Sequence, residues 1–148
     1  MSAYYFAYGS NMNPARMKAR GMMVADMQPG TLQGMRLAFN KRAADAPNIS
    51  CANVVYDARS LVEGVLYRLA GIEEIGKMDY YEGTPRFYSR DIFTIETAGG
   101  AVPAWVYIAN AAVISEGLKP SQQYLQHLLA GREFLSSEYY GVLLDTPC

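Results

Sequence analysis

The stretch YYFAYGSNMNPARM, residues 4–17, passes from an aromatic run through a polar turn into a segment with helical features. Tyr and Phe favour strands, so a strand is expected over residues 3–8. A helix is expected over residues 14–20, because Asn13 is a good N-cap and proline suits the first turn of a helix. This strand and helix start the fold, and the turn between them is a candidate site.

The turn after the first strand has two interpretations. Gly9 has no Cβ, so a backbone or a ligand can approach it closely. Ser10 and Asn11 add short polar side chains, and the first N–H groups of the following helix have no partner within that helix. Such a loop could hold a carboxylate or a phosphate. The simpler interpretation, which the loop taken alone favours, is a turn capped by serine and asparagine.

The rest of the chain carries patterns of further strands and helices. The two turns that join strands are expected near residues 57–60 and at Gly99-Gly100. About six strands, with helices early, in the middle and late, predict a single α+β domain over residues 1–148: a small mixed, largely antiparallel β-barrel flanked by helices. The expected strands are 3–8, 30–43, 51–58, 61–70, 87–98 and 101–109, and the expected helices are 14–20, 71–83, one that starts at Pro120-Ser121 and one near 136–144.

Composition limits the classes of function. The 148 residues are 51% apolar and 18% charged, which is typical of a globular chain. A net charge of −1 argues against nucleic-acid binding, which needs a basic surface. No stretch reaches the roughly 20 apolar residues of a membrane span, and the N-terminus does not resemble a signal peptide. The charged residues expected to be simply exposed are Arg16, Lys18 and Arg20 on the first helix and Glu73, Glu74 and Glu96 elsewhere.

Residue types for nucleophilic or metal chemistry are scarce. Cys51 and Cys148 are too few for a disulfide framework and are expected to be free thiols in the cytoplasm. His127 is the single histidine, and a surface or core-edge position on a helix is expected for it. No group of residues has metal-ligand spacing, so no metal is expected.

The segment MDYYEGTPRFYSR, residues 78–90, contains an acid with a candidate role. Glu82 ends the expected central helix and so lies at the unfavourable end of the helix dipole for an acid. Nearby aromatic side chains would remove it from water. Both effects would raise its pKa above about 4.3 and make it a better base near neutral pH. The equally open alternative is an exposed glutamate before a C-cap glycine. The aromatic residues are Tyr80, Tyr81, Phe87 and Tyr88.

A third segment, KPSQQYL, covers residues 119–125 and starts a late helix. Tyr124 lies on this helix. The simpler interpretation is that its ring packs into the core, and the alternative is that its hydroxyl contacts a ligand.

Four of these short motifs, taken in order, resemble the gamma-glutamylcyclotransferase-like family. That family includes the plant AIG2-like proteins and bacterial enzymes that remove a gamma-glutamyl protecting group during antibiotic assembly. The similarity spans residues 4–144, and the fold that it implies, a small mixed barrel flanked by helices, agrees with the pattern of elements. The motifs are YGSNM (8–12), EGVLYRL (63–69), DYYEG…FYSR (79–90) and PSQQYL (120–125).

The resemblance implies roles for individual residues. Glu82 matches the catalytic glutamate of the family, and Tyr124 matches a tyrosine that contacts the substrate. The residues around the glutamate, including Tyr80 and Tyr81, depart from the best-known cyclotransferases, so the leaving group is not carried over. The substrate-binding loop of the family matches Tyr8, Gly9, Ser10, Asn11 and Met12.

The activity implied is that of a gamma-glutamyl cyclotransferase, a lyase or acyltransferase that needs no cofactor. The alpha-amine of a small gamma-glutamyl substrate attacks its own gamma-carbonyl, which releases 5-oxoproline and an amine or amino acid. Glu82 would act as general acid and base. The alternatives are a non-catalytic module that binds a gamma-glutamyl compound or another carboxylate, and an amidase or acyl transferase. The sequence leaves open the leaving amine, the oligomeric state, and whether the loop holds the alpha-carboxylate or the reacting carbonyl.

Overall fold

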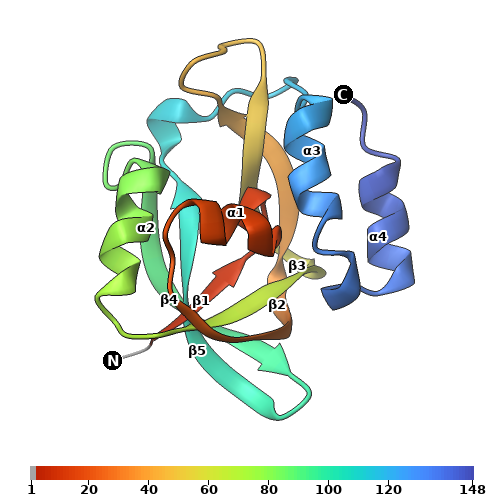
Figure 1. Cartoon of the computed structure of the whole chain (residues 1–148). Coiled ribbons are helices and arrows are strands. Elements are labelled where there is room, and N and C mark those ends of the chain that lie inside the picture. Colours follow the sequence, from red (N-terminus) through yellow and green to blue (C-terminus); the bar gives the residue numbers. More distant parts are fainter. Residues whose placement is uncertain (1–2) are drawn as a thin grey trace.

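Five strands close into a barrel in the computed structural model of this protein, which describes residues 3–148 (Figure 1). The strand order is β1-β3-β2-β4-β5, and a parallel contact between β1 and β5 closes the ring, whereas the other pairs are antiparallel. This confirms the predicted α+β barrel flanked by helices. The elements are β1 (Tyr4–Ala7), η1 (Ser10–Met12), α1 (Pro14–Ala19), β2 (Val24–Arg42), β3 (Ser50–Leu69), α2 (Glu74–Glu82), β4 (Tyr88–Thr97), β5 (Gly100–Ala109), η2 (Ala111–Val113), α3 (Gln122–Leu129), η3 (Arg132–Phe134) and α4 (Ser137–Leu144).

The two strands expected between residues 51 and 70 are one strand, β3, so the described chain has five strands and not six. The Asp57 carboxylate accepts hydrogen bonds from the Arg59 N–H (3.1 Å) and the Ser60 hydroxyl (2.8 Å). Opposite this point, the register of β2 shifts around Gly34, which has a φ of 80°. The turn signal therefore marks an irregularity inside a long β2–β3 ladder, because the chain bends there without reversing.

Local sequence signals place most other elements correctly. Asn13 caps α1 by accepting a hydrogen bond from the Ala15 N–H, and serines cap α3 and α4 in the same way. The β4–β5 hairpin turns at Ala98 and Gly99, and Gly100, with a φ of 120°, starts β5. The strand expected from residue 30 begins earlier, at Val24, because this segment pairs with the end of β3.

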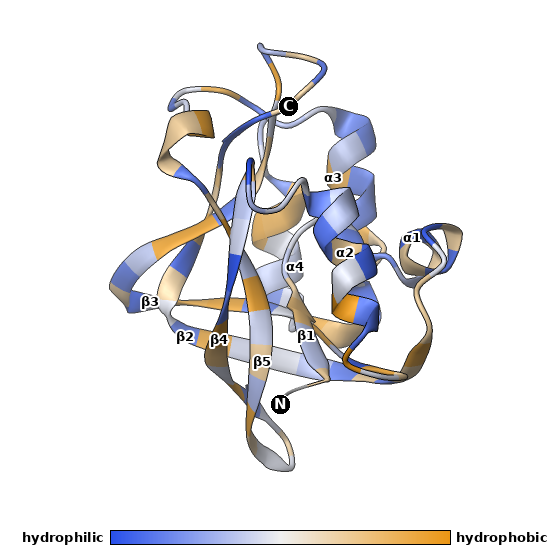
Figure 2. Cartoon of the chain, turned by 90° about the vertical axis from the view of Figure 1, so that its left-hand side faces the viewer, coloured by the Kyte–Doolittle hydropathy of each residue, from blue (hydrophilic) through white to orange (hydrophobic). Residues whose placement is uncertain are grey.

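Strand β1 contributes to two apolar clusters, one on each face. Phe6 of the strand and Tyr8, which directly follows it, belong to a cluster built mainly from strand side chains, which fills the barrel. Tyr5 and Ala7 belong to the other cluster, which includes residues of the helices such as Leu128. This alternation follows from the two-residue period of a strand. In Figure 1, α2 lies on one side of the barrel and α3 and α4 on the other, and Figure 2 shows short hydrophobic and hydrophilic bands in succession along the strands.

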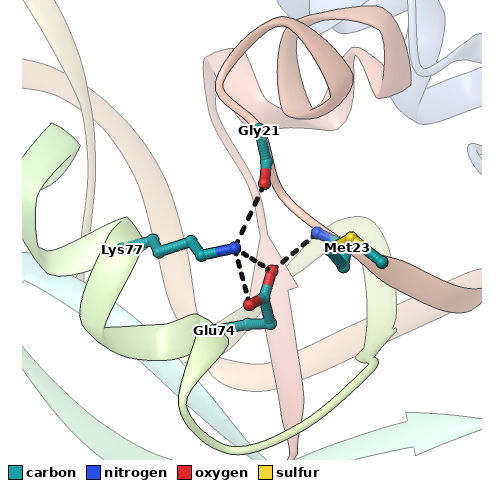
Figure 3. Close-up of polar contacts among 4 residues, drawn as sticks. All are labelled: Gly21, Met23, Glu74 and Lys77. Carbon is teal, nitrogen blue, oxygen red and sulfur yellow. Dashed lines mark hydrogen bonds and ion pairs between the residues drawn. The ribbon is translucent and has the colours of Figure 1, made fainter.

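Glu74 was expected to be an exposed acid, but it is buried. Its carboxylate accepts a hydrogen bond from the Met23 N–H (2.7 Å) and pairs with the Lys77 ammonium (2.8 Å), which also donates to the Gly21 carbonyl (3.4 Å; Figure 3). Hydrogen bonds from Lys77 hold the pKa of Glu74 below its usual value. These contacts tie the first turn of α2 to the connection between α1 and β2, and so they fix the helix that ends at Glu82.

Replacing Glu74 by alanine should lower the free energy of unfolding by roughly 1–3 kcal/mol, because the Met23 amide loses its acceptor and Lys77 its partner. Urea unfolding monitored by circular dichroism measures this. Glu73→Ala is the matched control, since Glu73 is exposed and should change stability by less than about 0.5 kcal/mol. Equal effects of the two substitutions would contradict the anchoring role of Glu74.

The cysteines and the histidine lie where the sequence places them. Cys51 and Cys148 are free thiols, and His127 is partly buried on α3. Within residues 3–148, no helix is long and apolar enough to cross a membrane. The same residues contain no group of three or more His, Cys, Asp or Glu side chains that could hold a metal ion.

Candidate active site

The turn after β1 forms one wall of a pocket with about 300 Å³ of empty space. We call it the inner pocket. It brings together three segments far apart in the sequence: the turn, the end of α2 and the start of α3. Of the predicted substrate-binding residues, all but Met12 line it; Met12 is fully buried in the core beside Gly131. The lining residues are Tyr5, Tyr8, Gly9, Ser10, Asn11, Ala52, Glu82, Tyr88, Tyr107 and Tyr124.

Glu82 reaches this pocket because α2 ends abruptly there. Gly83 has a φ of 63°, a left-handed conformation that ends helices and that residues with a Cβ rarely adopt. The N–H of Thr84 then bonds back to the Asp79 carbonyl (2.9 Å). A Cβ at Gly83 would also collide with the ring of Phe87. Glycine is therefore required at this position, and the chain turns away immediately after the acid.

Asn11 contacts Glu82 directly. Its Nδ2 lies 3.2 Å from Glu82 Oε1 and 3.0 Å from the Tyr5 hydroxyl, and its Oδ1 accepts a hydrogen bond from Arg20 (2.9 Å). Since Oδ1 is taken by a cation, the amide nitrogen must face the carboxylate. The Tyr67 hydroxyl holds the Asn11 backbone carbonyl at 2.7 Å. The side chain of Asn11 thus contacts protein groups and orients Glu82, a role that the sequence did not indicate.

Burial raises the pKa of Glu82 to about 7, although Arg20, Lys41 and Arg16 nearby favour the ionised form. The expected shift is present and desolvation is its largest cause, but the aromatic residues around the acid differ in part from those expected. Tyr80 is 82% exposed, so it does not desolvate the acid as expected. Of the four aromatic residues near Glu82 in sequence, only Tyr88 lines the inner pocket. The other aromatic walls are Tyr5, Tyr8, Tyr107 and Tyr124.

The raised pKa should make stability fall as pH rises. In the unfolded chain Glu82 loses its proton near pH 4.5, whereas in the folded protein it keeps the proton to about pH 7. This group therefore contributes a decline in the free energy of unfolding across that window, of up to about 3 kcal/mol, and no further change above it. Glu82→Gln cannot ionise, so the variant should gain stability over the wild type between pH 5 and pH 8.

Urea unfolding of both proteins at pH 5 and pH 8 measures this gain. Glu73→Gln serves as control, because it removes an exposed acid and should follow the wild type. A Glu82→Gln variant whose stability tracks the wild type at both pH values would show that Glu82 titrates normally.

Tyr124 packs its ring into the core, as the simpler interpretation expects. Its ring packs against the two apolar clusters, and its hydroxyl accepts a hydrogen bond from the Ala52 N–H (2.9 Å) at the pocket wall. A Cβ at Gly9 would lie 3.1 Å from this hydroxyl and 3.1 Å from the Ala52 Cβ. Gly9 therefore permits the close approach of the turn to α3 and β3.

The sequence did not indicate that Tyr5, Ala52 and Tyr107 line the inner pocket. Tyr107 lies on β5, and its hydroxyl donates to Asp79 (2.6 Å), which also pairs with Arg90 (2.8 Å). Its ring meets the ring of Tyr5 edge-on at 5.8 Å. The hairpin register pairs Tyr107 with Arg90, but no local signal shows which face of the hairpin meets the turn after β1.

A second pocket opens beside the first, with about 640 Å³ of empty space. We call it the outer pocket. It shares Ser10, Glu82, Tyr88 and Tyr124 with the inner pocket. Its further lining residues are Arg16, Arg20, Lys41, Ala44, Cys51, Tyr80, Tyr81, Gly83 and Phe87.

The basic residues of α1 were expected to form a solvated face, and for two of the three this is wrong. Arg16 and Arg20 are partly buried and line the outer pocket, whereas Lys18 is exposed. The Arg16 Nε donates to the Ser10 hydroxyl (3.1 Å), and Arg20 bonds Asn11 as described. The helix spacing alone did not show that the turn lies next to this face.

The sequence matches the model of a known protein family. The family model described as gamma-glutamyl cyclotransferase, AIG2-like, matches residues 5–129. No curated protein has a significantly matching sequence.

Solved structures share the fold. A structure named gamma-glutamyl cyclotransferase superposes with a TM-score of 0.81 and 22% identity, over 97% of this chain and 87% of that one. YkqA from Bacillus subtilis gives a TM-score of 0.83 and 25% identity over 97% of this chain and 55% of that one. A gamma-glutamyl cyclotransferase specific to glutathione, from yeast, gives 0.67 and 13% identity over 96% and 93% of the two chains.

Proposed function

Because the chain belongs to the AIG2-like gamma-glutamyl cyclotransferase family, we propose that it releases 5-oxoproline from a small gamma-glutamyl compound, with Glu82 as general acid and base. The position of Glu82 carries the proposal. A carboxyl group with a pKa of about 7 lies in the wall of a pocket, and another wall of this pocket is the turn that the resemblance implies for substrate binding. Catalytic acids and bases work best with a pKa near the working pH.

The reaction needs no nucleophile from the protein. The substrate's alpha-amine attacks its gamma-carbonyl carbon, and the new C–N bond closes a five-membered ring. The tetrahedral intermediate then collapses, the bond to the departing nitrogen breaks, and 5-oxoproline leaves. A well-oriented intramolecular attack of this kind can lower the barrier by about 7–11 kcal/mol. The main task of the pocket is to hold the substrate folded.

The reaction also needs proton transfers between the two substrate nitrogens, and one carboxyl group can carry them out. Ionised Glu82 takes a proton from the alpha-ammonium, which frees the lone pair for attack. The protonated acid then gives this proton to the departing nitrogen, which leaves as the neutral amine. The new ring nitrogen still carries one extra proton, and it gives this proton to the regenerated carboxylate as the ring amide forms. Asn11 holds the carboxyl group in place through both steps by its contact with Oε1. Such acid–base help is typically worth 10²–10⁴-fold in rate.

The turn after β1 supplies the polar groups that would orient the substrate. Gly9 and Ser10 line the inner pocket beside Glu82. Backbone N–H groups there would stabilise negative charge on the substrate's carbonyl oxygen or hold its alpha-carboxylate. Burial raises the pKa of Tyr124, so its hydroxyl stays protonated and can donate a hydrogen bond across the working range.

The one thiol near the site is a poor candidate nucleophile. Cys51 lines the outer pocket only, and burial raises its pKa. His127, which would have to activate it, is not among the residues that line either pocket. Covalent catalysis by a Cys-His pair therefore has no geometric support in the described residues.

Glu82→Gln should lower kcat at least about a hundredfold, since the amide cannot move the protons. The assay follows 5-oxoproline released from a panel of gamma-glutamyl amino acids and amines. Glu73→Gln, an exposed change in the turn just before the same helix, is the control and should keep wild-type activity. Equal activity of Glu82→Gln and wild type would assign the proton transfers elsewhere. Binding of a gamma-glutamyl compound without turnover would favour the non-catalytic module, and free glutamate as product would indicate an amidase.

The pH profile of kcat/KM should fall on its acid side with an apparent pKa of about 7, because the free enzyme must carry Glu82 ionised. Initial rates of 5-oxoproline release from pH 4.5 to pH 9, at substrate concentrations far below KM, measure this. A profile that stays flat down to pH 5 would contradict the assignment of Glu82 as the base.

A further inference from the structure

The outer pocket differs in charge from the molecule as a whole. The chain has a net charge of −1. The lining of this pocket has three cations, Arg16, Arg20 and Lys41, and one acid, Glu82. The lining therefore carries a net positive charge even when that acid is ionised.

Lys41 is the least expected of the three cations. It lies near the end of β2 and is only 6% exposed. Its ammonium lies over the rings of Phe87 (5.1 Å) and Tyr88 (5.5 Å). The ion pairs found within residues 3–148 join Lys77 with Glu74 and Arg90 with Asp79, so Lys41 has no carboxylate partner there. Lysines are almost never this buried without one, because burial of an unpaired charge is costly.

The two arginines are also held by neutral groups. Arg16 donates to the Ser10 hydroxyl, and Arg20 donates to Asn11 and stacks on the ring of Tyr81 at 4.9 Å. Neither forms an ion pair in the part of the chain that the structure describes. Three cations from two separate segments thus converge on one pocket that contains a single acid, Glu82. This is an arrangement suited to an anionic group of a ligand.

We propose that the outer pocket binds a carboxylate on the leaving group, so that gamma-glutamyl amino acids or peptides are preferred over gamma-glutamyl amines. This rests on the proposed function, in which the inner pocket holds the gamma-glutamyl group with its carbonyl at Glu82. The leaving nitrogen then points into the outer pocket across the residues that the two pockets share. A leaving group with a second, protonated amine would meet three like charges there and would be rejected.

The test compares two substrates that differ by one carboxylate: gamma-glutamyl-alanine and gamma-glutamyl-ethylamine. The wild type should show a kcat/KM at least about tenfold higher for gamma-glutamyl-alanine, as the loss of a charge-assisted contact predicts. Lys41→Met should reduce this ratio toward one. Lys41 is chosen because Arg16 and Arg20 also hold Ser10 and Asn11 in place. Lys18→Met removes the same charge from an exposed position and should keep the wild-type ratio.

Two outcomes would overturn the proposal. One is a wild-type kcat/KM that is equal for both substrates or higher for the ethylamine compound. The other is an equal fall for both substrates in Lys41→Met, which would assign the cations to the carboxylate of the gamma-glutamyl group itself. The comparison of the two substrates in the wild type does not depend on whether any variant folds.

Binding of dead-end analogues separates this proposal from the proposed reaction. Glutaryl-alanine and glutaryl-ethylamine lack the alpha-amine and cannot cyclise. Isothermal titration with the wild type should give at least about tenfold tighter binding of glutaryl-alanine, and equal affinities would overturn the carboxylate site. If no 5-oxoproline is ever released but this preference is found, the reaction fails and the binding site stands. If the two gamma-glutamyl substrates are turned over equally well, the proposed reaction stands and the carboxylate site fails.

Discussion

The contact between Asn11 and Glu82 is the interaction on which the candidate site depends. It joins the turn after the first strand to the end of a helix 71 positions later in the sequence. Each side of the contact is fixed independently. The Tyr67 hydroxyl and Arg20 hold Asn11, and the buried carboxylate of Glu74 anchors the helix that carries Glu82. A carboxyl group placed in this way keeps one orientation while its protonation changes, as a proton-transfer group must.

The site is built from groups that cost stability. Glu82 is partly buried and desolvation raises its pKa to about 7, and Lys41 is buried without a carboxylate partner among the described residues. Neither arrangement would be favoured by folding alone, because water solvates isolated charges better than a protein interior does. The two apolar clusters offset these costs, one filling the barrel and the other packing helices against its outside. Unfavourable groups gathered at one pocket, in an otherwise well-packed domain, are typical of a functional site.

Predictions from sequence succeeded where the deciding interactions are local. Asn13 caps α1, and the β4–β5 hairpin turns next to Gly99 and Gly100, as predicted. Both features depend only on neighbours a few positions away. They failed where contacts with a segment distant in the sequence determine the conformation or the burial of a residue. The residues around Asp57 are typical of a turn, but pairing with β2 continues the strand through them. Glu74 has the sequence context of an exposed acid, but its carboxylate is buried against the Met23 amide. The two arginines of α1 were assigned to solvent for the same reason.

By itself, the sequence determined the class of fold, the main helices and strands, and the family, together with Glu82, the loop of residues 8–12 and Tyr124 as the residues to examine. These follow from caps, strand alternation and short motifs, all of which are local. Only the tertiary structure decided that Asn11 orients the acid, that barrel tyrosines and not Tyr80 desolvate it, and that three cations line the adjoining pocket. The physical reason is that desolvation and electrostatic fields depend on distances through space, and the closure of the barrel sets those distances between segments that no local pattern relates.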